Sequence, residues 1–377
     1  WSMANDKGEN LLEPGNTPHQ NLRFLACLAI TLKAVYDHAA PLRASIASPG
    51  NDHRLGANEA PPAIISAFIG ELLENILNSI EAGKALKATD QQIIDLGVSQ
   101  IPNVSKDYTD RNRTSPFAFT GNKFEFRAVG SSQNSSVPMA ILNAAVSASF
   151  KECSARLKEI LKKKKRDEAI MELVRQVVKE TKNIRFSGNG YSDEWKVEAK
   201  KRGLPILNTT PEALSVFKDK KAMQFLISTN VLSAEEIESR YHIAVERYIK
   251  TLEIEHLTLV ELTQTYVLPA LEKQIHSSFK VNESITSKAT QKVFENRLKE
   301  MNDVLGSVLS ELEKFQSLLA KSQGISSDEK RMHDIVNHVQ PASFKLRDAC
   351  DTAERVVADD IWPLPKYREI LLANSLT

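Results

Sequence analysis

Apolar residues in the second half of the chain recur at the spacing of helices that pack on one another. One series runs in alternating steps of four and three: Met301, Leu305, Val308, Leu312, Phe315 and Leu319. Such steps place every apolar side chain on one face of a helix. Similar patterns predict helices over residues 166–182, 191–202, 234–280 and 326–358, with breaks near residues 188–190, 203–205, 230 and 324. We therefore expect a helical bundle or an array of helical hairpins after residue 150.

The first 150 residues are more varied and predict a mixture of helices and strands. Residues 21–46 are apolar with few breakers and predict a long helix, which a Pro/Gly/Asn cluster at 48–52 ends. Residues 64–80 predict a short strand followed by a helix, and residues 83–116 are rich in loop signals. Another helix is predicted to begin near Ser135. The fold class expected for the chain is α+β, with a mainly helical region from 151 to 377.

A strand predicted over residues 123–129 alternates charged and aromatic side chains. Lys123, Glu125 and Arg127 would share one face, and the two intervening phenylalanines the other. An ordinary half-exposed strand is the more common origin of this pattern. Two arginines, Arg111 and Arg113, come shortly before it, and clustered guanidinium groups suit phosphate oxygens. The charged face is therefore a candidate phosphate-handling site with one carboxylate that could bind a metal ion.

A second constellation lies at residues 51–62, where Asp, His, Arg and Glu occur in a loop that contains glycine. Catalytic groups often lie in such loops, although a solvated charged loop is the more common case. The basic run at 162–166 is followed at once by acidic residues and is typical of a solvated helix face. The histidines of the helical half are scattered, which indicates surface or packing roles.

Composition narrows the class of protein. The 377 residues include 49 Lys and Arg against 48 Asp and Glu, so the formal net charge is +1. Without a basic excess, a nucleic-acid partner is not expected. Three widely separated cysteines, Cys27, Cys153 and Cys350, favour reduced intracellular thiols. No apolar run reaches the length of a membrane span, and no signal peptide is visible. A cytoplasmic protein without a membrane association is expected.

Taken together, these segments resemble the glutamine synthetase family, in its long type III form. The resemblance rests on residues 51–62, on Arg-Asn-Arg at 111–113, on Lys-Phe-Glu-Phe-Arg at 123–127, and on Trp-Pro-Leu-Pro-Lys-Tyr-Arg at 362–368. The match is to the C-terminal half of the family, and the chain begins with Trp1, so we expect an N-terminal part to be missing. The resemblance implies the end of a catalytic domain at 1–150, with a partial antiparallel sheet and helices, followed by a helical extension at 151–377.

The family resemblance implies a ligase reaction. ATP phosphorylates the γ-carboxylate of glutamate, and ammonia then displaces phosphate to give glutamine. Positioned cations and a divalent metal, Mg²⁺ or Mn²⁺, stabilise the charge that builds on the phosphoryl oxygens. By resemblance, Glu125 is a metal ligand. Glu59 is the carboxylate that shields the intermediate and accepts a proton from the attacking ammonium, where exclusion of water matters.

The remaining roles also come from the resemblance. Arg54 and Arg127 would hold the glutamate carboxylate or the acyl phosphate, and Arg113 would contact the phosphates of ATP. Catalytic roles are expected for Arg54 and Arg113 together with Glu59. Lys123 and Ser2 are further candidates for ATP binding, although Lys123 stands where the family usually has arginine and offers a point charge instead of a fork. A ring-shaped homo-oligomer, a dodecamer, is the implied assembly.

Some positions depart from the common family pattern and leave alternatives open. Ala118 stands where that pattern carries a second arginine, and Arg54 and Glu59 are one residue closer together. Most of the acidic metal ligands are expected upstream of Trp1, so we expect this chain to be inactive alone. The alternatives are a non-catalytic family member, a helical assembly module that binds partners, and a ligase that joins γ-glutamyl groups to polyamines or other amines.

Overall fold

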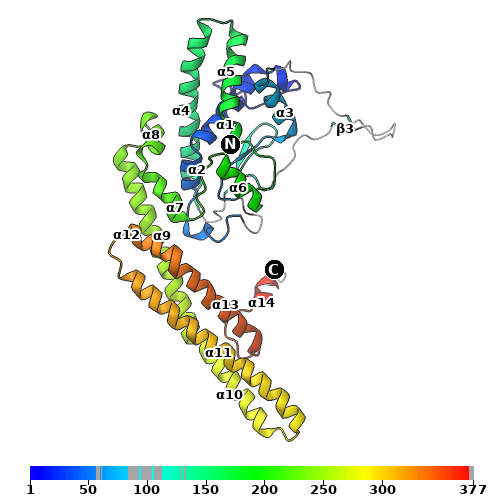
Figure 1. The fold of residues 1–377 in the computed structure, drawn as a ribbon, viewed down its shortest axis with the longest axis vertical. Helices are drawn as coiled ribbons and strands as arrows, with labels where there is room; N and C mark the ends of the chain where they lie inside the picture. The colour runs from blue at the N-terminus through cyan, green and yellow to red at the C-terminus, as the bar shows by residue number, and fades with distance from the viewer. Residues whose placement is uncertain are drawn as a thin grey trace. The chain divides into compact units, whose positions relative to one another are not determined.

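The computed structural model describes residues 1–56, 60, 62–83, 93–94, 104–105, 113–128, 130 and 133–372, with the backbone alone at 93–94 and 104–105. The chain forms two compact units, Trp1–His242 and Ile243–Thr377 (Figure 1). Each unit has buried apolar residues of its own.

Helix α1 (Leu22–Asp37) lies at the centre of the first unit. The side chain of Asn21 accepts a hydrogen bond from the Phe24 backbone and caps its start. Both α4 (Ser136–Leu161) and α5 (Arg166–Glu180) pack against α1, as Figure 1 shows. The predicted long helix over 21–46 is two helices, α1 and α2 (Ala39–Ser45). Pro41 accounts for the break, because it cannot donate a hydrogen bond to Asp37 and its ring would clash with that carbonyl.

A three-stranded sheet lies beside these helices. Its strands are β1 (Ala67–Phe68), β4 (Phe117–Phe119) and β5 (Phe124–Phe126), in the order β1-β4-β5. The α+β prediction is confirmed, but the sheet is mixed, not wholly antiparallel: β1 and β4 are parallel, and β4 and β5 are antiparallel. Helix α3 (Gly70–Glu81) lies in the connection that parallel pairing requires. The segment predicted to be loop-rich holds an antiparallel pair, β2 (Ile93–Ile94) and β3 (Val104–Ser105).

Short backbone pairings extend the sheet at both edges. Trp1 exchanges two hydrogen bonds of 2.8 Å with Phe124 beside β5. At the other edge Arg185 pairs with Ala67, and the Phe186 N–H donates to the Ala67 carbonyl at 2.9 Å. The N-terminal segment and a segment from the helical region therefore both align with the central strands.

Several helices after residue 150 belong to the first unit. They are α5, α6 (Asp193–Lys201), α7 (Thr210–Leu214), α8 (Lys220–Ser228) and the start of α9 (Ala234–Leu262). The helices predicted over 166–182 and 191–202 are confirmed, whereas α7 and α8 were not predicted. Residue 150 lies within α4. The division into a catalytic part at 1–150 and an extension at 151–377 stays a prediction.

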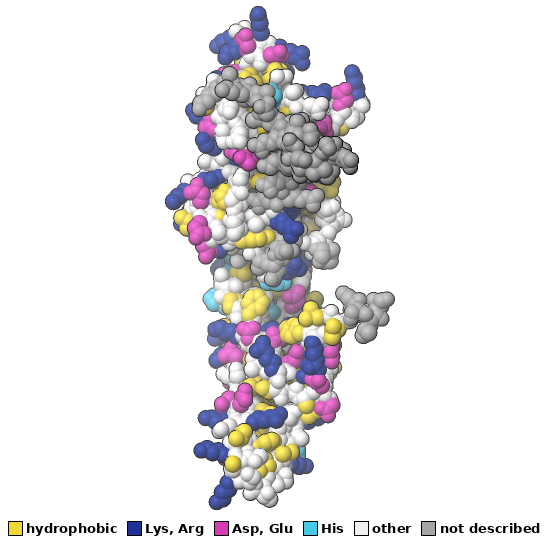
Figure 2. Space-filling model, turned by 90° about the vertical axis from the view of Figure 1, so that its right-hand side faces the viewer, with side chains coloured by type: hydrophobic (Ala, Val, Ile, Leu, Met, Phe, Trp, Pro, Cys, Tyr) yellow, Lys and Arg dark blue, Asp and Glu magenta, His cyan; other side chains and the backbone are white. Residues whose placement is uncertain are grey.

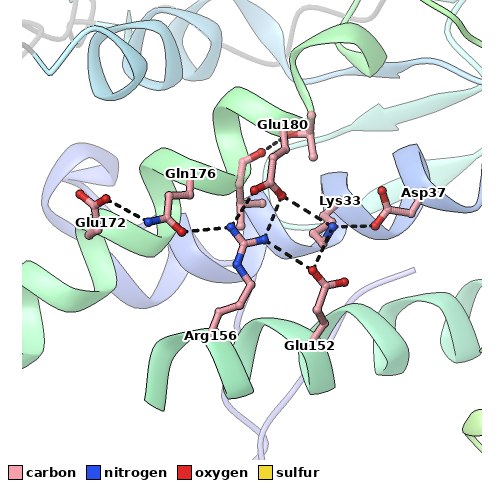
Figure 3. A network of polar contacts seen from close by, with 9 residues as sticks. Lys33, Asp37, Glu152, Arg156, Glu172, Gln176 and Glu180 are labelled. Atoms are coloured by element: carbon pink, nitrogen blue, oxygen red, sulfur yellow. Dashed lines mark hydrogen bonds and ion pairs between the residues drawn. The ribbon is translucent and has the colours of Figure 1, made fainter. Parts of the chain in front are cut away.

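A partly buried ion network joins α1, α4 and α5 (Figure 3). The Lys33 ammonium lies 2.8 Å from Asp37, 3.4 Å from Glu152 and 3.7 Å from Glu180. The Arg156 guanidinium donates to both oxygens of Glu180, at 2.9 and 2.7 Å. Burial alone would lower the pKa of Lys33, but Asp37 and the two glutamates together raise it above its usual value. The network fixes how the three helices face one another.

The second unit consists of helices. After the remainder of α9, they are α10 (Leu268–Ser284), α11 (Lys288–Gln323), α12 (Asp328–Asp334), α13 (Gln340–Val356) and α14 (Tyr367–Leu372). Helix α11 packs against α10 and α13. Its predicted apolar face is confirmed, since five of the six positions are buried and Leu305 is half-buried.

Two π-helical turns interrupt the long helical runs predicted over 234–280 and 326–358. They lie at Thr263–Val267 and Ile335–Val339, and each is followed by a proline, Pro269 or Pro341, at the second position of the next helix. Proline has no N–H to continue the helical ladder, which favours a local change of winding. His256 and Gln340 join the two runs, with 3.0 Å between Nε2 and Oε1.

Three further properties of the described residues concern the thiols, the surface charges and the length of the helices. The three cysteines are free and buried, and burial raises the pKa of the Cys27 and Cys153 thiols to about 11. Positive and negative side chains are intermixed on the face that Figure 2 shows. Within the described part of the chain, every helix is too short or too polar to cross a lipid bilayer.

Candidate functional site

Strand β5 carries the charged face that the alternation predicted. The Phe124 ring is fully buried and stacks on Phe117, with centroids 4.5 Å apart, while Phe126 is partly buried. On the opposite face, Lys123 is exposed and Glu125 is half-buried. The strand is shorter than predicted, at residues 124–126, and the last predicted residue, Val129, lies outside the described residues.

Glu125 and Arg127 lie together on this face. The Arg127 guanidinium donates from Nε and Nη2 to Glu125 Oε2, at 3.1 and 2.9 Å. The Arg127 backbone N–H donates to the Pro116 carbonyl at 2.8 Å, so the end of β5 stays attached to β4. The Glu125 side chain is 43% exposed, and the Arg127 side chain is 21% exposed. Glu125, the candidate metal ligand, and Arg127, the candidate for binding the substrate, therefore form an ion pair that solvent can reach.

Ser2 and Lys123 are also brought together. Because Trp1 and Phe124 exchange both of their backbone hydrogen bonds, the two segments run antiparallel and Ser2 falls opposite Lys123. The Trp1 indole N–H donates to the Asn143 side chain at 2.8 Å and attaches this segment to α4. Both candidate ATP-binding residues are exposed at this edge of the sheet.

Arg113 is exposed just before β4, and the next residue contacts the helical region. Thr114 Oγ1 accepts a hydrogen bond from the Gly190 backbone N–H at 2.8 Å. A Cβ at Gly190 would lie 2.7 Å from the Thr114 carbonyl oxygen and 3.2 Å from Pro62 Cγ. Gly190 thus touches both the segment of Arg113 and the segment that follows Glu59. Arg111 and Glu59 lie outside the described residues.

Arg54 is exposed on the loop that begins at residue 51. Two residues earlier, Asp52 Oδ1 accepts hydrogen bonds from the backbone N–H and the hydroxyl of Thr210, at 2.7 and 2.6 Å. At the other end of the loop, Gly56 has a φ of +75°, and a Cβ there would lie 4.0 Å from the Pro62 Cα. Gly56 and Pro62, which flank the segment of Glu59, therefore lie close to each other.

A buried arginine supports this loop from α2. Arg43 is 1% exposed, and its Nε donates to the Leu207 carbonyl at 3.0 Å. Burial lowers the pKa of Arg43 to about 10, and the negative charges of Asp52 and Glu212 oppose that change. The loop of Arg54 thus lies between a buried cation and helix α7.

These supporting residues were not predicted as part of a site. Asp52 was noted only as one charge in the loop, and residues 188–190 only as a break between helices. The signal was a Gly-Asn-Gly sequence in an otherwise glycine-poor region. Nothing in the local pattern shows that Thr210 would meet Asp52, because the two residues are 158 positions apart.

The site offers cations for phosphate or carboxylate groups, and one carboxylate for a metal ion. Within the described residues, His, Cys, Asp and Glu side chains form no group of three or more that could hold a metal ion. Glu125 could therefore contribute one ligand but does not form a metal site with the described residues alone.

Comparisons with known proteins agree with the resemblance in the sequence. A family model described as glutamine synthetase C-terminal domain matches residues 169–289. A protein named type-3 glutamine synthetase from Dictyostelium discoideum is 42% identical over 380 residues, which cover 98% of this chain and 51% of that protein. Over nearly its whole length the chain is similar to glutamine synthetases, and residues 169–289 match that family's C-terminal domain.

Two bacterial glutamine synthetases are similar over the same extent. The one from Bacteroides fragilis (strain YCH46) is 35% identical, and the one from Butyrivibrio fibrisolvens is 37% identical, each over 99% of the chain and 53% of the relative. The chain thus spans about half the length of the curated relatives it matches. Gly190 and Thr210, which hold the two candidate site segments, both lie within the part matched by the glutamine synthetase C-terminal domain.

Proposed function

We propose that the full-length protein is a glutamate–ammonia ligase that forms glutamine at the expense of ATP. In this reaction the γ-phosphoryl group of ATP passes to the γ-carboxylate of glutamate, and ammonia then attacks the acyl carbon and releases phosphate. The observation that carries the proposal is the 42% identity, over 98% of this chain, to a protein named type-3 glutamine synthetase.

The anion-binding roles fall to the exposed and half-buried cations of the site. Arg54 and Arg127 would bind the carboxylate of glutamate or the acyl phosphate. Arg113 and Lys123 would neutralise the phosphates of ATP, and Ser2 would hydrogen bond to the nucleotide. The position of Ser2 opposite Lys123 supports a common ligand for these two residues. Fixed cations of this kind stabilise charge that develops during phosphoryl transfer.

Two carboxylates have separate proposed roles. Glu125 would be one ligand of Mg²⁺ or Mn²⁺, with further ligands from outside the described residues. When bound, such a cation supplies charge neutralisation for the phosphates. Glu59 would accept a proton from ammonium and shield the acyl phosphate from water. Gly56 and Pro62, which flank Glu59 in the sequence, lie close to each other.

The assembly and cellular location are parts of the same proposal. A ring-shaped homo-oligomer, a dodecamer, is expected, and the cytoplasm is the expected compartment. Light scattering of the purified full-length protein measures its mass directly. A monomer that is fully active would contradict the proposed ring.

The activity is tested by incubating the full-length protein with ATP, Mg²⁺, glutamate and ammonium, and by quantifying glutamine and ADP. Glutamine is expected only when all four are present. A matched reaction with polyamines or other amines in place of ammonium separates the amine-ligase alternative. A folded protein that forms no glutamine contradicts the ligase proposal. The chain of 377 residues alone is expected to form none, and turnover by it would contradict that expectation.

A further inference from the structure

Two segments of the candidate site are held by one stretch of the helical region. We propose that residues 185–212, called here the supporting segment, position Arg54 and Arg113 for the ligase reaction through the contacts of Thr210 with Asp52 and of Gly190 with Thr114. This inference rests on the proposed function and gives the supporting segment a part in it.

The first contact fixes the loop of Arg54. Asp52 accepts two hydrogen bonds from Thr210, at 2.6 and 2.7 Å, and Thr210 is only 1% exposed. Hydrogen bonds to a carboxylate are stronger than those between neutral groups, and burial excludes competing water. The Arg54 backbone N–H in turn donates to the Asn51 carbonyl at 3.1 Å. A displacement of Asp52 would therefore move the turn from which Arg54 projects.

Charge in the surroundings favours this contact. The buried guanidinium of Arg43 lies close enough to Asp52 and Glu212 for both carboxylates to act on its pKa. It also donates to the Leu207 carbonyl, which is in the supporting segment. Arg43 thus attracts the Asp52 carboxylate and holds the supporting segment beside it.

The second contact fixes the segment of Arg113. The Gly190 N–H donates to Thr114 Oγ1, and the Gly190 Cα lies so close to the Thr114 carbonyl that a Cβ would be at 2.7 Å. A Cβ and a carbonyl oxygen cannot lie that close together, so the backbone of Gly190 or Thr114 would have to move. Pro62, at 3.2 Å from the same point, would be displaced too. A single methyl group at Gly190 would therefore disturb both site segments together.

The supporting segment has its own contacts with the rest of the first unit. At its start, the Phe186 N–H donates to the Ala67 carbonyl of the sheet, and the Phe186 ring stacks on Trp195 with centroids 3.7 Å apart. The Arg202 guanidinium donates to the Arg185 carbonyl at 2.7 Å and lies over the Trp195 ring. These contacts attach residues 185–202, and with them Gly190, to the central sheet. The part near Thr210 is held by the hydrogen bond from Arg43 to the Leu207 carbonyl.

The expected consequence is a specific change in kinetics. A misplacement of about 1 Å at reacting groups can lower the rate by about 100-fold. A displaced Arg54 loop would also admit water, which attacks γ-glutamyl phosphate and returns glutamate and phosphate. ATP is then consumed without glutamine. The ratio of phosphate released to glutamine formed should rise, and a loss of folded protein alone would leave this ratio unchanged.

The test uses the full-length protein and compares Asp52→Ala with Asp52→Asn. The alanine variant should lose about 10- to 100-fold in kcat/KM for glutamate and show a raised phosphate-to-glutamine ratio. The asparagine variant keeps an oxygen that accepts from Thr210 and should recover most of the activity. Asp193→Ala is the matched control, because that carboxylate is in the same supporting segment and is 89% exposed. It should behave like the wild type.

Three further variants keep the inference testable if Asp52→Ala does not fold. Thr210→Val removes the hydroxyl and keeps the backbone donor, and Thr210→Ser retains both. The valine variant should show a raised ratio of phosphate to glutamine, and the serine variant should not. Gly190→Ala, which acts from the other contact, should raise the ratio as well.

The outcomes separate the two proposals. The positioning role is overturned if the wild type is active and the Asp52→Ala and Thr210→Val variants keep its kcat/KM and its ratio of phosphate released to glutamine formed. The same holds if activity falls only in proportion to the folded fraction. A folded wild type that forms no glutamine overturns the proposed function, and the positioning role with it.

Discussion

The carboxylate of Glu125 accepts two hydrogen bonds from the guanidinium of Arg127, two residues further along the same face of β5. One oxygen, Oε2, receives both, at 3.1 and 2.9 Å. Under the proposed roles of Glu125 and Arg127, a metal ion and a substrate carboxylate would bind next to each other, each beside a partner of opposite charge.

Replacement of Glu125 tests its proposed metal role. Glu125→Gln should weaken the apparent affinity of the full-length protein for Mg²⁺ by at least about 10- to 100-fold, because even partners of metal ligands contribute that much. Its melting temperature should change little, since the Glu125 side chain is 43% exposed. Glutamine formation as a function of Mg²⁺ concentration measures the effect. Glu159→Gln, at a 69% exposed side chain, is the control, and an unchanged Mg²⁺ dependence of Glu125→Gln would contradict the role.

The ion network of the first unit should contribute to stability through Lys33. Lys33→Met removes a buried cation from three carboxylates and should lower the free energy of unfolding by about 1–3 kcal/mol. The value is below that of a fully buried network, because Glu152 and Glu180 are 51% and 42% exposed. Urea unfolding measures it. Lys162→Met, in an exposed pair with Glu159, should cost at most about 1 kcal/mol, and equal effects of the two variants would refute the prediction.

Substitutions at two adjacent residues of α11 should differ sharply in their effect on the stability of the second unit. Val308 is fully buried and Leu309 is 49% exposed. Val308→Asp places an unpaired carboxylate in the core and should destabilise the unit by several kcal/mol, on the order of 3 or more. Leu309→Asp should change stability by about 0.5 kcal/mol or less. Circular dichroism during thermal unfolding of both variants tests the assigned helix face, and similar melting temperatures would show that the assignment is wrong.

His256 should make the second unit sensitive to mild acid. Burial lowers the pKa of His256 below its usual value, and the hydrogen bond with Gln340 only partly offsets this. The unfolded chain then binds more protons than the folded one as pH falls below about 6.5, so stability decreases with falling pH. The free energy of unfolding from urea titrations should change between about pH 7.5 and about pH 5.5 by about 1 kcal/mol more in the wild type than in His256→Gln.

The control for this pH effect is His242→Gln, because the His242 side chain is 70% exposed. This variant should keep the pH dependence of the wild type. If His256→Gln keeps it too, the buried imidazole is not its origin.

Periodicity predicted what local sequence determines. The apolar face of α11 and the alternation along β5 were both correct, because each depends on side chains a few residues apart. Strand β4 was not predicted, since Phe-Ala-Phe at 117–119 is buried on both faces and shows no alternation. The break at His38 was missed although Pro41, a helix breaker, lies three residues after it.

Long-range contacts account for the rest. The pairing of Asp52 with Thr210 and of Thr114 with Gly190 joins residues 158 and 76 positions apart. Such partners are selected by the packing of helices on the sheet and leave no periodic trace in the sequence. The candidate site was thus predicted through its charged residues, while the residues that hold them in place became visible only in the fold.

The two π turns have a consequence for how the second unit can vary among relatives. Each turn accommodates additional residues within a helix, at Thr263–Val267 and at Ile335–Val339. Because such a turn holds more residues than the α-helical ladder needs, loss of one residue at the first turn would restore a continuous α-helix and keep the following helix in phase. Ala270 and Leu271, 3% and 0% exposed, would then stay in the core. A change of one residue in length is therefore expected to be tolerated at these two turns, whereas the same change inside α11 would rotate its buried face by about 100°.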